Sequence, residues 1–92
     1  MEPITKEYVF RGQYIPPRML YAIEYYVKEG RIPGHFLQAI IKNDLRDAVS
    51  RADDENLKNL AAYVGYFYNE TPGTCWGSEK HMLDWAKKFC KE

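Results

Sequence analysis

The chain has 92 residues, of which 46% are hydrophobic and 28% are charged. This length and composition are typical of one globular domain and exclude a disordered or fibrous chain. Thirteen basic and thirteen acidic side chains give a formal net charge of zero, which makes nonspecific binding to nucleic-acid phosphates unfavourable. The sequence shows no apolar signal core and no apolar run as long as a membrane span. We therefore expect a cytoplasmic protein with no membrane association.

The two cysteines, Cys75 and Cys90, are expected to be reduced thiols. The two histidines, His35 and His81, do not stand at metal-ligand spacing from them. The acidic run at 53–55 lacks the glycine and the regular alternation of a calcium loop. We therefore predict no disulfide, no metal site and no cofactor.

The N-terminal region is predicted to be a short extended arm, residues 1–15, before a helical domain, residues 16–92. Residues 7–15 combine β-branched and aromatic residues around a glycine, which indicates an extended arm or a strand that needs a partner. Pro17 suits the first turn of a helix over 17–29, and Gly30 suits its left-handed C-terminal cap.

A second helix is predicted to begin near Pro33. Two apolar stripes follow, over 36–41 and 45–52, and on a continuous helix they would be rotated about 100° apart. The rotation indicates a break or kink at Asn43-Asp44, whose short polar side chains suit a helix cap. One bent helix over the whole stretch is the alternative.

A fourth helix is predicted to begin after Asp53 or Asp54 and to continue to about Asn69. Its predicted inward stripe consists of Leu57, Leu60, Ala61, Val64, Phe67 and Tyr68. Ser78 is the predicted cap of a last helix. The residues of that helix spaced for burial are Met82, Trp85, Ala86, Phe89 and Cys90. The sequence thus predicts an all-α fold, a compact bundle of about five short helices with a short extended N-terminal arm.

Tyrosine is in surplus, with eight copies, and helical-wheel angles turn four of them away from the predicted core. Tyr21 and Tyr25 lie opposite the apolar stripe of the first helix. Tyr63 and Tyr66 point away from the stripe of the fourth. Because exposed tyrosines are enriched at interfaces, these four residues are predicted to contact a second subunit or another protein. The alternative is that these tyrosine rings only cover the protein surface and their hydroxyls are solvated.

The segment 68–78 is the densest polar and aromatic stretch of the chain. It runs into the start of the last helix, where unpaired backbone N–H groups favour an anion. The candidate ligand-binding residues are Arg18, Arg46, Arg51, Tyr68, Asn69, Glu70, Trp76 and Ser78. The structural alternative is that Ser78 only caps the helix and Trp76 packs as a lid on the core.

Catalysis is disfavoured because no complete catalytic constellation can be assembled. A helix N-terminus lowers the pKa of a thiol, so Cys75 is a candidate nucleophile with His35 or His81 as its base. No third residue that would orient the base can be identified. An inert packed thiol is therefore preferred, and no catalytic residue is predicted.

Short motifs stand along residues 15–86: Ile15-Pro-Pro-Arg-Met19, Tyr26-Val27 with Gly30, Pro33-Gly34-His35-Phe36-Leu37, Asn43-Asp44-Leu45, Arg51-Ala52-Asp53 with Asn56, and Tyr68-Asn69-Glu70 followed by Cys75-Trp76-Gly77-Ser78. In this combination they resemble a family of small phage and prophage proteins. The resemblance implies a viral accessory protein that acts in the bacterial host cytoplasm. It does not identify a substrate.

Small oligomeric phage proteins often act by binding, and some sequester the nucleotide signals of bacterial immunity. By this analogy of size and lifestyle, we predict a homo-oligomeric anti-defence protein that holds a nucleotide-like anion. Aromatic rings would stack on the base, arginines would pair with phosphate, and Asn69 would form hydrogen bonds with the polar edge of the base. The alternative is a protein-binding inhibitor of a host enzyme, anchored by the outward tyrosines. A small hydrolase built on Cys75 or Glu70 is the least favoured hypothesis.

Overall fold

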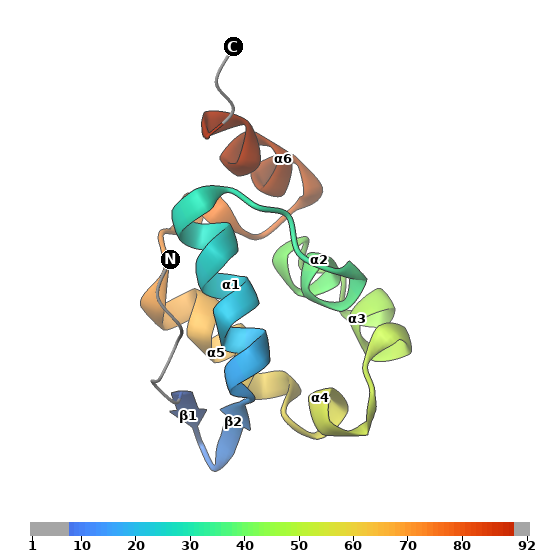
Figure 1. The fold of residues 1–92 in the computed structure, drawn as a ribbon. Helices are drawn as coiled ribbons and strands as arrows, with labels where there is room; N and C mark the ends of the chain where they lie inside the picture. The colour runs from blue at the N-terminus through green and yellow to red at the C-terminus, as the bar shows by residue number, and fades with distance from the viewer. Residues whose placement is uncertain (1–7, 90–92) are drawn as a thin grey trace.

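The computed structural model describes residues 8–89 (Figure 1). Its elements are β1 (Tyr8–Phe10), β2 (Gln13–Ile15), α1 (Pro17–Glu29), α2 (His35–Ile41), α3 (Leu45–Arg51), α4 (Asp54–Lys58), α5 (Leu60–Glu70), the 3-10 turn η1 (Gly73–Cys75) and α6 (Glu79–Lys88). Over the described range the fold is mainly α-helical, but it is not purely all-α because β1 and β2 form a small sheet. The predicted burial of Cys90 lies outside the described residues.

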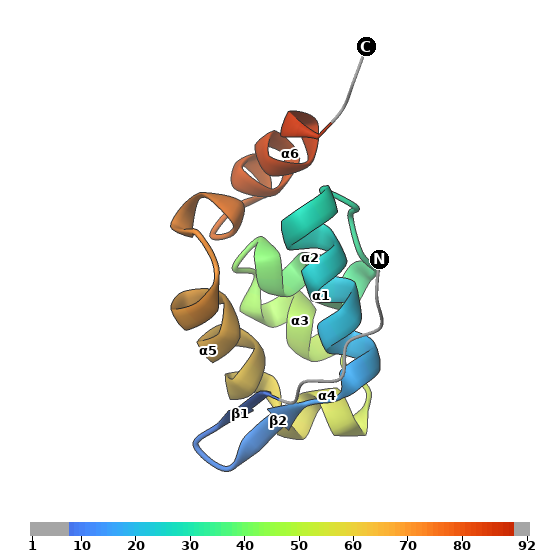
Figure 2. The same cartoon turned by 60° about the vertical axis from the view of Figure 1, so that its left-hand side comes forward.

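The predicted N-terminal arm contains a β-hairpin that packs on α5 (Figure 2). Arg11 and Gly12, which join the strands, both have positive φ, 52° and 82°. This is the conformation of a type I′ turn, whose twist matches that of the paired strands. The backbone N–H of Tyr14 donates to the Oδ1 atom of Asn59 at 3.0 Å. The extended segment therefore finds its partners within the chain.

The helical conformation is interrupted between α2 and α3 at the predicted place. Asn43 adopts a left-handed φ of 62°, and the carboxylate of Asp44 accepts a hydrogen bond from the backbone N–H of Asp47 at 3.1 Å. This is the N-cap that the sequence indicates. The two helices then pack against each other, so they are separate helices and not one bent rod.

The predicted fourth helix is in fact two helices, α4 and α5, separated by Asn59. The Asn59 side chain is buried, donates to the backbone carbonyl of Glu55 at 2.9 Å and accepts from the backbone N–H of Tyr14 at 3.0 Å. Such side-chain bonds to the backbone compete with helix continuation. The prediction of one continuous helix is therefore wrong.

The inward face of α5 differs from the predicted one, although Phe67 of the predicted stripe is fully buried. Leu57 on α4 is 46% exposed, and Val64 and Tyr68 on α5 are 42% and 77% exposed. Tyr63 and Tyr66 are only 0% and 8% exposed. The prediction that these two tyrosines point outward is wrong, and the stripe assigned to the core lies largely on the surface.

Tyr63 and Tyr66 can be buried because each hydroxyl has a partner. Tyr63 donates to the Oδ1 atom of Asn56 at 2.5 Å, and Tyr66 donates to the carboxylate of Glu24 at 2.9 Å. Burial raises the pKa of both phenols, and the bond to Glu24 raises that of Tyr66 further. Both side chains are therefore protonated core residues.

The core forms where the hairpin, α1, α2 and α5 meet, and η1 and α6 close it at one end (Figures 1 and 2). Its largest fully buried side chains are Tyr26, Tyr63, Phe67, Ile15, Leu20, Ile23, Ile41 and Cys75. None of the described helices has both the length and the apolar character needed to cross a membrane.

Gly30→Ala is expected to destabilise the fold by about 2–4 kcal/mol. Gly30 ends α1 with a φ of 73°, and an added Cβ would collide with the ring of Phe89. Gly12→Ala is the matched control, since Gly12 has a φ of 82° but no atom within 4 Å of an added Cβ. It should lose only the conformational part, about 1–2 kcal/mol. Urea unfolding measures both losses, and equal values would contradict the collision.

Candidate functional site

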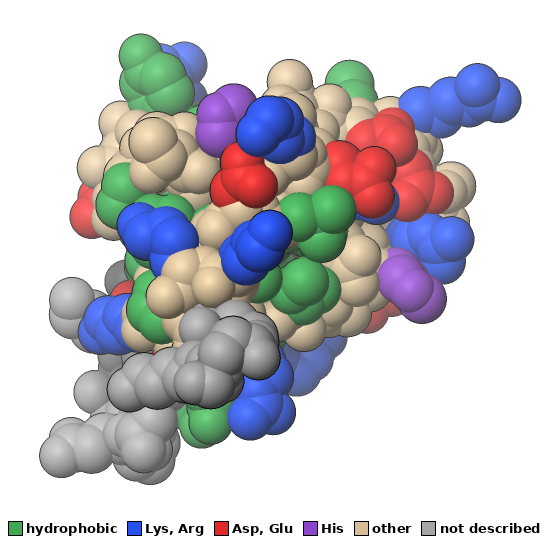
Figure 3. Space-filling model, turned by 90° about the horizontal axis from the view of Figure 1, so that it is seen from above, with side chains coloured by type: hydrophobic (Ala, Val, Ile, Leu, Met, Phe, Trp, Pro, Cys, Tyr) green, Lys and Arg blue, Asp and Glu red, His purple; other side chains and the backbone are tan. Residues whose placement is uncertain are grey.

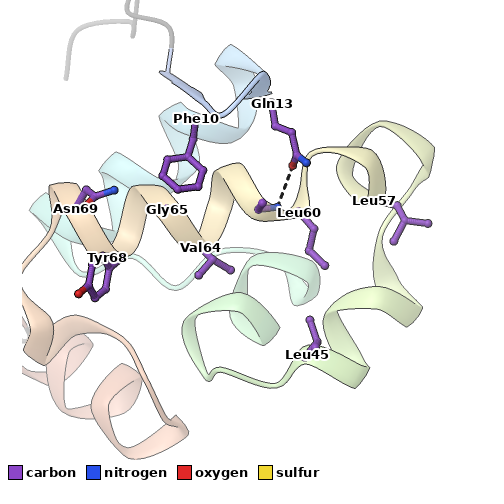
Figure 4. A pocket seen from close by; sticks show the side chains of 10 residues that line it. Phe10, Gln13, Leu45, Leu57, Leu60, Val64, Gly65, Tyr68 and Asn69 are labelled. Atoms are coloured by element: carbon purple, nitrogen blue, oxygen red, sulfur yellow. Dashed lines mark hydrogen bonds between the residues drawn. The ribbon is translucent and has the colours of Figure 1, made fainter.

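The exposed face of α5 borders an open groove of about 580 Å³ (Figure 4). The hairpin, α3, α4 and α5 contribute its lining. The lining residues are Phe10, Gln13, Leu45, Leu57, Leu60, Ala61, Val64, Gly65, Tyr68 and Asn69. None of these ten residues has a charged side chain. The volume is that of a site able to hold a small ligand or part of a protein partner.

The hairpin forms one side of the groove. Phe10 lies over Gly65 (Figure 4), where an added Cβ would come within 2.8 Å of the ring. Only glycine permits this approach without displacing the hairpin. Gln13 Oε1 accepts a hydrogen bond from the backbone N–H of Ala61 at 3.0 Å, which satisfies a donor in the first turn of α5. Packing and hydrogen bonding together fix the hairpin on the helix.

Two apolar ridges complete the groove. On α3, Leu45 lines the groove and is 63% exposed, and Val49, one helical turn further along, is 44% exposed but does not line it. On α5, Leu60, Val64 and Tyr68 follow the same spacing of four residues, which places them on one side of the helix. A small adjoining hollow of about 30 Å³ shares Leu45 and Val64 with the groove. Asn43 and Asp44 also line that hollow, so the apolar surface between α3 and α5 ends at a polar edge there.

The predicted ligand-binding residues of segment 68–78 separate into two groups. Tyr68 and Asn69 line the groove. Trp76 stacks on Phe67 with ring centroids 5.6 Å apart, and the Ser78 hydroxyl accepts a hydrogen bond from the first turn of α6 at 3.1 Å. For Trp76 and Ser78, the structural alternative of core lid and helix cap describes what is observed.

The predicted arginines are not gathered around the aromatic loop. Arg18 pairs with two carboxylates near the start of α4 at 3.5 and 3.8 Å, and Arg51 pairs with Asp47 at 3.2 Å within α3. Arg46 and Glu70 are exposed, and none of these side chains lines the groove. Basic and acidic side chains are also interspersed on the face shown in Figure 3. None of the three predicted arginines is thus placed to meet a ligand in the groove. Arg11, which was not among them, has its guanidinium 5.3 Å from the ring centroid of the groove residue Phe10.

Of the four predicted interface tyrosines, only those on α1 keep accessible surface to offer. Tyr21 and Tyr25 are half-buried and form an edge-to-face pair with ring centroids 5.8 Å apart. The Arg31 guanidinium lies 4.9 Å from the Tyr25 ring centroid, which is a cation–π distance. Tyr63 and Tyr66 are core residues and have almost no surface for a partner.

Cys75 is placed as a packed thiol. It is fully buried, and burial raises the pKa of its thiol, so the reactive thiolate is disfavoured. Its backbone carbonyl accepts a hydrogen bond from the buried Tyr26 hydroxyl at 2.7 Å. Within residues 8–89, no group of three or more His, Cys, Asp or Glu side chains is arranged to hold a metal ion.

Comparisons of the chain with protein-family models, with curated proteins and with solved structures found no match. The chemistry of the groove is therefore the basis for assigning a role.

Proposed function

We propose that this protein acts by binding, and that the groove between α3 and α5 receives an apolar face of a protein partner. One observation carries the proposal. Four large apolar side chains that are 42% to 77% exposed line one uncharged groove: Leu45, Leu57, Val64 and Tyr68. Contiguous apolar patches of this kind mark interaction sites on soluble proteins. The four-residue spacing of Leu60, Val64 and Tyr68 on α5 suits an amphipathic helix laid along it.

The biological setting in this proposal comes from the resemblance to small phage and prophage proteins. It would be a viral accessory protein in the bacterial cytoplasm, and its partner would be a host protein, such as a defence enzyme that it inhibits. The anchors differ from those the sequence favoured, because the groove side chains replace the buried Tyr63 and Tyr66.

Sequestration of a nucleotide-like molecule is the less favoured proposal. A base would have Tyr68 to stack on and Asn69 to bond with, both in the groove. Phosphate, however, needs cationic donors. None of the ten groove residues is charged, and Arg18 and Arg51 are already paired with carboxylates.

Affinity purification from bacterial cells tests the proposal. The proteins captured by the tagged wild type should include a defined partner that Leu45→Lys reduces about 10-fold or more, because a charge would be buried against an apolar face. Leu83→Lys is the matched control, since Leu83 is 48% exposed on α6 and does not line the groove. Identical capture by all three proteins would contradict the proposal. A nucleotide released by heat from the wild type would instead support sequestration.

A further inference from the structure

We infer that a second copy of this chain occupies the groove, so that two molecules pack about a two-fold axis. In this dimer the α5 helices are antiparallel and Val64 lies near the axis. The inference rests on the proposed function in one respect, namely that the groove is a docking surface. In the free protein a second copy covers this surface, and a host partner would bind in place of that copy.

The first argument is the area of apolar surface. The contributing side chains are 42% to 77% exposed: Leu45, Leu57, Val64 and Tyr68, which line the groove, and Val49, which neighbours Leu45 on α3. Together they expose roughly 600 Å², at the upper end for a patch on a monomer. A stable interface buries about 800 Å² on each partner. Pairing this face with its own copy reaches that size once the polar rim is included.

The second argument is shape. A two-fold interface joins a surface to itself, so the surface must carry both a projection and a place to receive it. Tyr68 is 77% exposed and projects from the second half of α5 (Figure 4). The first half contributes Leu60 and the small Ala61 to the groove. With Val64 at the axis, antiparallel pairing sets Tyr68 of one copy against Leu60 and Ala61 of the other.

The third argument is charge. The groove residues are uncharged, and the chain has a formal net charge of zero, so two copies approach without net repulsion. Antiparallel α5 helices also bring dipole ends of opposite sign together. A strongly acidic or basic partner would find no complementary charge in the groove. The uncharged face therefore favours an equally uncharged face, which the same chain supplies.

Light scattering coupled to size-exclusion chromatography tests the dimer. At about 100 µM, the wild type and the Leu83→Lys control should show twice the chain mass of 10.8 kDa. Val64→Lys and Val64→Glu should each raise the dimer Kd by about 30-fold or more, because like charges would meet at the axis. An equimolar mixture of these two variants should recover the dimer mass, since Lys then faces Glu. Circular dichroism reports whether each variant is folded, and Leu45→Lys repeats the test if Val64→Lys unfolds.

Three results would overturn the dimer: a monomeric wild type, a Val64→Lys variant that keeps the dimer mass, or a mixture that stays monomeric. The proposed function fails separately. A monomer that still loses a captured partner on Leu45→Lys substitution would remove the dimer and leave the function standing. A dimeric wild type whose captured proteins are unchanged by the Leu45→Lys substitution would leave the dimer standing and remove the proposed function.

Discussion

Tyr63→Ala is expected to destabilise the protein by about 3–5 kcal/mol. Tyr63 is fully buried, and its ring meets that of Phe36 edge to face with centroids 5.1 Å apart. Truncation leaves a cavity of aromatic size and removes the hydroxyl that bonds to the buried Asn56. Urea unfolding followed by circular dichroism measures the loss.

Tyr68→Ala is the matched control on the same helix. Tyr68 is 77% exposed, so its loss should change the stability of the monomer by no more than about 0.5 kcal/mol. The comparison is made at low protein concentration, where association does not add to stability. A larger loss for Tyr68 than for Tyr63 would restore the helix orientation that the sequence alone predicts.

The sequence predicts those helix ends that are set by local caps. Pro17 and Gly30 bound α1 as expected, Asp44 caps α3, and Ser78 caps α6. Each of these signals needs only a residue with the right backbone conformation or a side chain that reaches the next turn. No information from distant parts of the chain is required.

The face of α5 could not be predicted in the same way because it depends on distant partners. Asn59 interrupts the helix where it bonds to Tyr14, 45 positions away in the sequence. Tyr66 is buried where it bonds to Glu24, 42 positions away. A helical-wheel projection assigns leucine to the buried face and tyrosine to the boundary, and it contains no information about hydrogen bonds to distant residues.

The groove was missed for the same reason. The stripe that the sequence assigns to the core includes Leu57, Val64 and Tyr68, which are the side chains exposed at the site. One local signal was present: Asn56, seven positions before Tyr63, is buried and accepts a hydrogen bond from the Tyr63 hydroxyl. A face with both tyrosines and amides is as well able to be buried as a face of leucines, once every polar atom is satisfied.

Alkali is expected to unfold the protein within a few pH units above pH 10. Burial raises the pKa of Tyr26, Tyr63 and Tyr66 far above the ordinary value for tyrosine. The folded protein therefore keeps three protons that the unfolded chain releases above about pH 10. The stability contributed by these groups is fully present below that pH. As the pH rises further, the free energy of unfolding falls by about 1.4 kcal/mol per unit for each tyrosine, or about 4 kcal/mol for three.

Domains of this kind have a free energy of unfolding of about 5–15 kcal/mol. A decrease of about 4 kcal/mol per pH unit reduces it to zero within a few pH units. Far-ultraviolet circular dichroism and tyrosinate absorbance, recorded together as the pH rises, measure it. The loss of helix should coincide with ionisation of the buried tyrosines. Tyr63→Phe keeps the ring without the ionisable hydroxyl, so its stability should fall about 1.4 kcal/mol less per pH unit. Helical structure that persists after all eight tyrosines have ionised would show that Tyr26, Tyr63 and Tyr66 are not held protonated by the fold.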